Sequence, residues 1–212
     1  MAIAVANGTL GKRFGDDERL ATAKQLLTEL PERPGLPAAQ LLSVGIYLEA
    51  IGDAEDAEKV YRRLAAADDP EGIARNNLSM ILGRRGQLVE AISYAKLAVQ
   101  TAPDRTYALD TLAFVQRKSK DFDGACSSLQ EAIHREPWAI EWRLTLAETL
   151  AEAGKSQDAK AQISAIFELV PDQSKLSEGF KQRLRSLQQG IGESAIGQRW
   201  GQRFDLPLPV AN

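Results

Sequence analysis

The stretch Gly52–Asp69, GDAEDAEKVYRRLAAADD, decides the fold of this chain. It opens with a glycine, continues as a helical pattern and ends in two aspartates. Four of its residues share one helix face, at i, i+3, i+4 and i+7: Ala57, Val60, Tyr61 and Leu64. The pattern therefore predicts an amphipathic helix that follows a glycine turn and ends at a polar stop.

The first alanine of that helix recurs at a fixed interval along the chain. Steps of 34 residues from Ala57 reach Ala23, Ala91, Ala125 and Ala159. A second column of small residues has the same interval: Gly11, Gly45, Ser79, Ala113 and Ala147. Because a leucine at these positions would push two helix axes apart, the two columns predict pairs of closely packed helices.

Each period contains two helical patterns and the signals that separate them. The first pattern is Leu41, Val44, Gly45 and Leu48, again one helix face. Gly52 supplies the left-handed residue that ends this first helix. In a later period Lys120 occupies the same slot, where a side chain costs roughly 1 kcal/mol. Prolines that cannot continue a helix close the second pattern, at Pro103, Pro137 and Pro171.

This pattern resembles the tetratricopeptide repeat, whose 34-residue unit has the form L-G-x2-Y, then A-x3-F, then P. The matching residues here are Val44-Gly45 with Leu48, Ala57 with Tyr61, and the three prolines. The resemblance covers residues 4 to 173 and implies an all-α fold, a right-handed α-solenoid of helix-turn-helix repeats. The expected repeats are 4–37, 38–71, 72–105, 106–139 and 140–173, of which the first is the weakest.

Two further segments follow the repeats. Residues 174–189 have one apolar stripe and one charged side, which predicts a helix that caps the last repeat and completes a solenoid domain of residues 1–190. Residues 191–212 are rich in glycine and then broken by proline, which predicts an extended or flexible tail. Around Trp200 and Phe204 this tail is apolar and basic. It is a candidate for self-binding in the groove, with a plain linker as the equal alternative.

Composition and charge exclude several classes of function. The net charge of −3 offers no basic field for nucleic acid, and no apolar run approaches the roughly 20 residues of a membrane helix. Cys126 is the only cysteine, so an intrachain disulfide is impossible. The amino-terminal residues lack the features of a secretory signal, so we expect a cytoplasmic protein.

Catalytic and metal-binding residues are sparse. His134, the only histidine, is expected to be solvated, and Cys126 is expected to be a half-buried, inert thiol. One cysteine and one histidine do not form a usual zinc site, and no phosphate-binding loop or nucleophile motif is present. We therefore expect no enzyme activity, no cofactor and no metal.

The resemblance implies that a second stripe on the first helix of each repeat lines a concave groove for peptides. The candidate groove residues are Asn76, Asn77, Met80, Arg84, Tyr107, Asp110, Phe114, Arg117, Lys118, Glu141 and Glu148. The two asparagines can bond a peptide backbone as donors and as acceptors. The three cations can hold a carboxylate. Met80, Tyr107 and Phe114 are expected to be exposed apolar anchors, since an exposed patch of this kind usually marks a binding surface.

These residues favour a protein-interaction scaffold or adaptor that binds an extended peptide or a partner helix. The alternative is a repeat region that serves an enzyme or a polymer-export assembly, such as a glycosyltransferase or an exopolysaccharide system, which flanking sequence would reveal. A third class, an RNA-binding repeat array, would need basic groove residues in every repeat. The cations here are answered by Glu49, Glu148 and Glu152, which argues against it.

Overall fold

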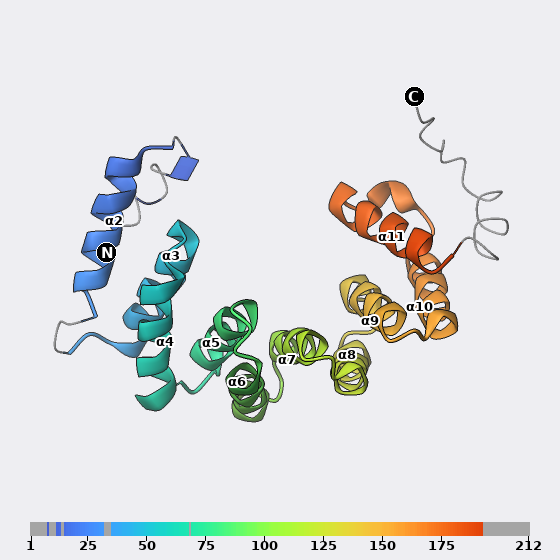
Figure 1. Ribbon diagram of the computed structural model, residues 1–212, viewed down its shortest axis with the longest axis horizontal. Coiled ribbons are helices and arrows are strands. Elements are labelled where there is room, and N and C mark those ends of the chain that lie inside the picture. Colours follow the sequence, from blue (N-terminus) through green and yellow to red (C-terminus); the bar gives the residue numbers. More distant parts are fainter. Residues whose placement is uncertain (1–7, 9–11, 14, 32–34, 68, 193–212) are drawn as a thin grey trace. The chain divides into compact units, whose positions relative to one another are not determined.

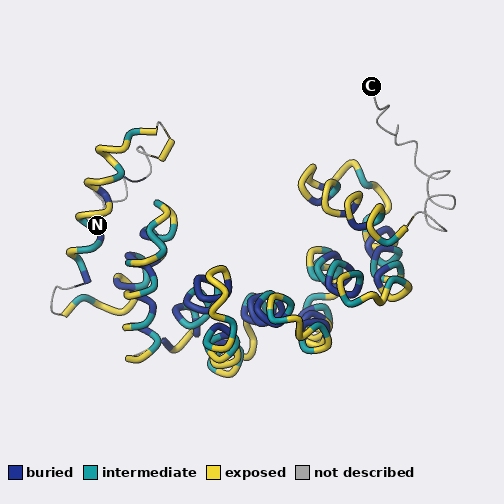
Figure 2. Tube along the Cα trace, viewed as in Figure 1, coloured by how far each residue is buried: buried dark blue, intermediate teal, exposed yellow. Residues whose placement is uncertain are grey.

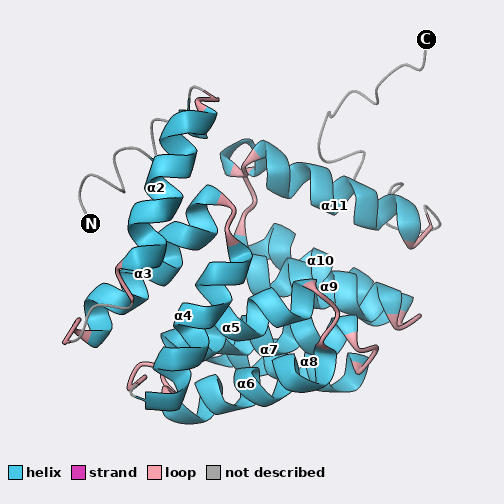
Figure 3. Cartoon of the chain, turned by 60° about the vertical axis from the view of Figure 1, so that its left-hand side comes forward, coloured by secondary structure: helices cyan, strands magenta, loops and turns pink. Residues whose placement is uncertain are grey.

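The computed structural model describes residues 8, 12–13, 15–31, 35–67 and 69–192. Within these residues every regular element is a helix and none is a strand (Figures 1 and 3). The predicted all-α class is therefore confirmed. The chain divides into two compact units, Met1–Ser119 and Lys120–Asn212, which we call unit 1 and unit 2.

The helices of each unit follow one another in pairs joined by short turns. Unit 1 contains α2 (Asp17–Glu29), α3 (Ala38–Ile51), α4 (Ala54–Ala67), α5 (Ile73–Arg84), α6 (Leu88–Thr101) and α7 (Thr106–Lys118). Unit 2 contains α8 (Phe122–Arg135), α9 (Ile140–Glu152), α10 (Ser156–Leu169), the 3-10 turn η1 (Gln173–Lys175) and α11 (Glu178–Gly190). In unit 1, successive helices from α2 to α7 pack against one another, and α5 also packs on α7. In unit 2, α9 packs against α8, α10 and α11.

The turns within the pairs have the geometry that the sequence predicts. Gly52 has φ +94°, and the backbone N–H groups of Gly52 and Asp53 donate to carbonyls of the last turn of α3. Lys120, in the equivalent slot, is the one non-glycine residue with positive φ, +68°, among the residues that the structure describes. The predicted strained position is thus confirmed.

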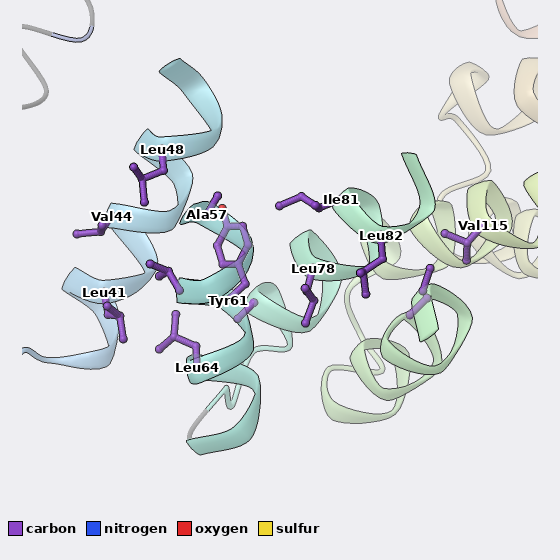
Figure 4. Close-up of a cluster of buried hydrophobic side chains, with 14 of the residues drawn as sticks. Leu41, Val44, Leu48, Ala57, Tyr61, Leu64, Leu78, Ile81, Leu82 and Val115 are labelled. Atoms are coloured by element: carbon purple, nitrogen blue, oxygen red, sulfur yellow. The ribbon is translucent and has the colours of Figure 1, made fainter. Parts of the chain in front are cut away.

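The members of the two small-residue columns that the structure describes are buried in the core; Gly11 lies outside the described residues. Alanines 23, 57, 91, 125 and 159 are all 0% exposed, as predicted. The columns meet directly in α5 and α6, where the Ser79 hydroxyl donates to the carbonyl of Ala91 at 2.8 Å. At Gly45 a β-carbon would lie 2.5 Å from Cε1 of Tyr61, so a larger residue would collide with that ring. Figure 4 shows the Tyr61 ring among the apolar side chains of α3 and α5.

Burial alternates around each helix, with buried positions toward its neighbours and exposed positions on the outside (Figure 2). The predicted capping helix forms as α11 and buries Leu176, Phe180, Leu184 and Leu187 at its base and along one face. It begins at Glu178 rather than at residue 174, because the Ser177 hydroxyl accepts the N–H of Phe180 and fixes the helix start. The expectations for Trp200 and Phe204 lie outside the described residues.

Candidate binding site

Most of the predicted groove residues lie on two neighbouring helices of unit 1. We name this set the unit 1 stripe: Asn76, Asn77, Met80 and Arg84 on α5, and Tyr107, Asp110, Phe114, Arg117 and Lys118 on α7. The two helices approach closely at Gly83, where a β-carbon would lie 2.8 Å from Val115 Cγ1 and 3.1 Å from Phe114 Cε1. The two remaining predicted residues, Glu141 and Glu148, lie on α9 in unit 2.

A hydrogen-bonded network runs from α3 through α4 to α5 beside the stripe. The Tyr61 hydroxyl lies 3.0 Å from Glu49 Oε2, and Asn77 Nδ2 donates to the same hydroxyl at 3.2 Å. Asn76 Nδ2 donates to Asn77 Oδ1 at 3.3 Å. Arg84 forms an ion pair with the other oxygen of Glu49 at 3.5 Å. Both asparagines and one cation of the predicted site therefore share one network.

Tyr61 is not among the predicted site residues, because the repeat pattern places it in the packing seam. Glu49 is predicted only as one of the acidic residues that answer the cations. The Tyr61 side chain is fully buried, and burial raises its pKa, with the charge of Glu49 adding to that increase. One signal in the sequence could have found it. The equivalent positions of the following repeats hold Ala95, Leu129 and Ile163, so Tyr61 is the one member of this column with a hydroxyl.

One polar atom of this network lacks a partner. Among the residues that the structure describes, Asn76 Oδ1 is shielded from solvent and accepts no hydrogen bond. A buried acceptor without a donor costs roughly 1–3 kcal/mol. Such a cost at a predicted contact residue is consistent with a role in binding rather than in folding.

The apolar members of the stripe are less exposed than predicted. Met80, Tyr107 and Phe114 are all half-buried. The Phe114 ring packs against Gly83, and Lys118 Nζ lies 5.9 Å from the centre of that ring. The prediction of exposed anchors did not account for the close approach of α5 and α7, which covers one side of the Phe114 ring.

Tyr107 is held at the other end of α7. Its hydroxyl donates to the carbonyl of Glu71 at 2.7 Å. Burial raises the pKa of Tyr107, which keeps the hydroxyl protonated as a donor. Arg105, which precedes α7, forms an ion pair with the Glu71 side chain at 3.3 Å. The hydroxyl contact fixes the ring, so Tyr107 offers a rigid edge rather than a mobile anchor.

In unit 2 the predicted acidic residues are bound by the chain's own arginine. Arg183 of α11 bonds both oxygens of Glu148 at 2.9 Å through Nε and Nη2. The same guanidinium donates to Glu141 Oε2 at 2.9 Å and to the Thr145 hydroxyl at 3.2 Å. These carboxylates raise the pKa of Arg183, Glu148 contributing most. The sequence pattern predicts Arg183 only as part of the charged, solvent-facing side of the capping helix.

The remaining titratable candidates, His134 and Cys126, both lie on α8. His134 is exposed on α8, as expected. Cys126 is 7% exposed, more deeply buried than expected, and burial raises the pKa of its thiol. No group of three or more His, Cys, Asp or Glu side chains in the described part of the chain has an arrangement that could hold a metal ion. Among the described helices, none has both the length and the hydropathy that a membrane crossing requires.

Comparison with protein-family models gives one answer for most of the repeat region. Models described as tetratricopeptide repeat match residues 45–106 and 116–179. Together these segments span more than half of the chain, and the first of them includes every residue of the hydrogen-bonded network. No curated protein sequence matches the chain.

Solved structures with the same fold cover most of the chain. The MamA 41-end fragment from Desulfovibrio magneticus RS-1 is 18% identical, covers 82% of this chain and 97% of its own, and has a TM-score of 0.64. TTC0263, a thermophilic TPR protein from Thermus thermophilus, is 22% identical over 87% of this chain and 98% of its own, with a TM-score of 0.62. YrrB, described as a TPR protein with an unusual peptide-binding site, is 15% identical over 86% and 92%, with a TM-score of 0.62. At these identities the similarity shows the fold alone.

Proposed function

This chain belongs to the tetratricopeptide repeat family, and on that premise we propose that it is a non-catalytic scaffold that binds an extended peptide along the unit 1 stripe. In this role it would join proteins to one another and make or break no covalent bond. The observation that carries the proposal is the network that links Asn76, Asn77 and Arg84 through Glu49 and Tyr61.

The network suits the backbone of an extended chain. An extended peptide presents unpaired N–H and C=O groups along its length, and asparagine amides offer both an acceptor and donors. Asn76 Oδ1 has no partner in the free protein, and a peptide N–H that reaches it by displacing the groups that shield it would remove that energetic cost. YrrB, which has a similar fold, has a peptide-binding site, and this supports the same class of ligand here.

The charges of the stripe favour a peptide that contains an acidic residue beside an apolar one. Arg84 has a side chain 62% exposed, so its guanidinium remains accessible despite the ion pair with Glu49. Lys118 is also exposed and lies over the half-buried ring of Phe114. A carboxylate beside these cations would gain charge-assisted hydrogen bonds, while an apolar side chain could pack against the part of the Phe114 ring that remains exposed.

The proposed peptide site does not include the predicted acidic residues of unit 2. Glu141 and Glu148 are bound by Arg183, so a ligand would have to displace hydrogen bonds from an arginine of the same chain. Hydrogen bonds between charged groups are the strong ones. We therefore confine the proposed peptide site to unit 1.

A comparative pull-down tests this function. The intact protein is compared with an Asn77→Ala, Arg117→Ala double variant, and partners are identified by mass spectrometry. A Lys96→Ala, Gln100→Ala double variant is the matched control, because both residues are exposed on α6, a helix that contributes no residue to the unit 1 stripe. We expect partners that are lost from the stripe variant and retained by the control. Recovery of the same partners from both variants would contradict the stripe assignment.

A further inference from the structure

The Tyr61 hydroxyl is not required by the packing of its position. The same column holds Ala95, Leu129 and Ile163, all 0% exposed and all without a polar group. The core therefore accepts an apolar side chain at this position in every following repeat. A buried hydroxyl costs free energy unless it is hydrogen-bonded, so its presence here is tied to the partners that it reaches.

Those partners lie beside the proposed peptide site. The Tyr61 ring starts on α4 and passes Gly45, whose missing side chain leaves the space that the ring fills. Its tip meets Glu49 on α3 and Asn77 on α5. In Figure 4 the ring lies between the apolar side chains of these two helices.

The chemistry of the partners fixes the direction of each hydrogen bond. An ionised carboxylate can only accept, so the Tyr61 hydroxyl donates its proton to Glu49. The hydroxyl oxygen then accepts from Asn77, which turns the nitrogen of that amide toward Tyr61. The oxygen of Asn77 consequently faces Asn76 and accepts from Asn76 Nδ2. Asn76 is left with its own oxygen without a donor among the described residues.

From this sequence of bonds we propose that Tyr61 is a positioning residue of the unit 1 stripe. Its hydroxyl, bonded to Glu49, orients the amides of Asn77 and Asn76. The oxygen of Asn76 is shielded from solvent in the free protein, so a ligand whose main-chain N–H bonds to it must displace the groups that cover it. We call the hydrogen bonds from Glu49 through Tyr61 and Asn77 to Asn76 the relay. The raised pKa of Tyr61 keeps its hydroxyl protonated, so these bonds keep their direction over the physiological pH range. This inference rests on the proposed function for the ligand and on the geometry alone for the relay.

The relay itself is tested without a ligand. Tyr61→Phe removes the hydroxyl and keeps the ring, and Tyr47→Phe, at a partly buried tyrosine of α3, is the control. Side-chain amide resonances of Asn76 and Asn77 are compared by nuclear magnetic resonance. We expect both pairs to shift in Tyr61→Phe and to stay in place in the control, while backbone amides of α6 keep their positions. Unchanged Asn77 side-chain resonances in Tyr61→Phe would overturn the inference.

The second arm measures recognition of backbone N–H groups. The probes are a capped heptapeptide with one aspartate and one phenylalanine, and its backbone N-methylated analogue, which lacks N–H donors. We expect wild type to prefer the parent peptide by about tenfold, in line with one hydrogen bond to a buried acceptor, and Tyr61→Phe to lose that preference. A preference that survives in Tyr61→Phe contradicts the positioning role.

A further variant separates failure of the relay from failure of the fold or of the proposed function. Glu49→Leu keeps the Tyr61 ring and removes both carboxylate oxygens, so the hydroxyl loses its acceptor and the same amide shifts and the same loss of preference are expected. If Tyr61→Phe does not fold, Glu49→Leu decides the question by the same criteria. Shifted amides together with no binding of either probe to wild type would uphold the relay and refute the peptide function.

Discussion

At the scale of single residues, Gly45 and Tyr61 are matched in size. The missing β-carbon of Gly45 is the space that the tyrosine ring occupies, because a methyl group there would lie 2.5 Å from the ring. Both residues are buried, so neither can yield into solvent. The small column therefore does two things here: it brings α3 and α4 together, and it lets the hydroxyl reach Glu49 and Asn77.

The first prediction concerns this match. Gly45→Ala should lower the free energy of unfolding by about 1–3 kcal/mol, because overpacking a closed core forces the ring or the helices to shift. Chemical denaturation measures the change. Gly179→Ala is the control, since that glycine lies in α11 with nothing within 4 Å of an added β-carbon. Alanine there should stabilise the helix by roughly 0.5–1 kcal/mol. Equal effects of the two substitutions would contradict the packing account.

A second residue-scale prediction concerns the buried thiol. Because burial raises the pKa of Cys126, the folded chain holds less thiolate than the unfolded chain at the same pH. Iodoacetamide should therefore alkylate the native protein at least about tenfold more slowly than the urea-unfolded protein at roughly pH 8, near the ordinary thiol pKa. The difference should shrink as pH rises through the raised pKa. A Val89→Cys variant, at a position 85% exposed, should react quickly in the native state. Fast native labelling of Cys126 itself would show that it is not shielded.

At the residue scale, the sequence predicts which positions are buried but not which side chains form the hydrogen-bonded network. The burial of Ala57 and its counterparts follows from the repeat interval, because a residue that recurs at a fixed period in every helix pair occupies the same place in each. The role of the Tyr61 hydroxyl does not follow from periodicity. It depends on side-chain contacts with Glu49 and Asn77, which the one-dimensional pattern does not specify.

At the scale of elements, α11 combines two kinds of attachment to unit 2. Its apolar face buries Phe180, Leu184 and Leu187, which covers the end of the repeat core. Its polar side contributes Arg183, which bonds two carboxylates and one hydroxyl on α9. A predicted binding surface is thus partly closed by the cap of the same chain.

The third prediction follows from that contact. Arg183→Ala should weaken the attachment of α11 and speed hydrogen exchange of its backbone amides by about fivefold, near 1 kcal/mol after allowance for the 41% exposure of the side chain. Arg185→Ala is the control, because Arg185 forms an ion pair only with Glu178 of its own helix in the described contacts, at 3.9 Å, and its side chain is exposed to solvent. Mass spectrometry of deuterated peptides measures both. Exchange that is unchanged in Arg183→Ala would mean that the apolar face alone holds the helix.

The cap also shows how far elements can be predicted. Its existence and its apolar stripe follow from the spacing of Phe180, Leu184 and Leu187. It starts at Glu178 rather than at residue 174, because the cap at Ser177 outweighs the helical pattern before it. The bond to Glu148 joins residues 35 apart in sequence, so it depends on how α11 docks on α9 rather than on any local signal.

At the scale of the whole molecule, the chain is a set of repeated helix pairs whose interval is fixed by sequence and whose ligand is not. Ion pairs join neighbouring repeats within each unit, such as Lys24 with Asp53 at 2.8 Å and Lys155 with Asp123 at 2.7 Å. The lysine of each pair is exposed, and ion pairs at the surface contribute little stability each. The fold could be predicted because every repeat has the same pattern of small and apolar residues. The partner could not be predicted from this sequence, because its identity depends on the sequence of another chain.

The central claim is that the unit 1 stripe contacts an extended peptide, and site-specific photo-crosslinking tests it most directly. A crosslinking amino acid replaces Met80 on α5 or, in the control, Val89 at the exposed start of α6. Mass spectrometry then maps the residues that each position captures in partners recovered by the pull-down. We expect Met80 to capture one short segment, with an acidic and an apolar residue close together, and to lose it when Asn77→Ala and Arg117→Ala are added. Capture of that segment from Val89 alone, or capture from Met80 that survives both substitutions, would contradict the account.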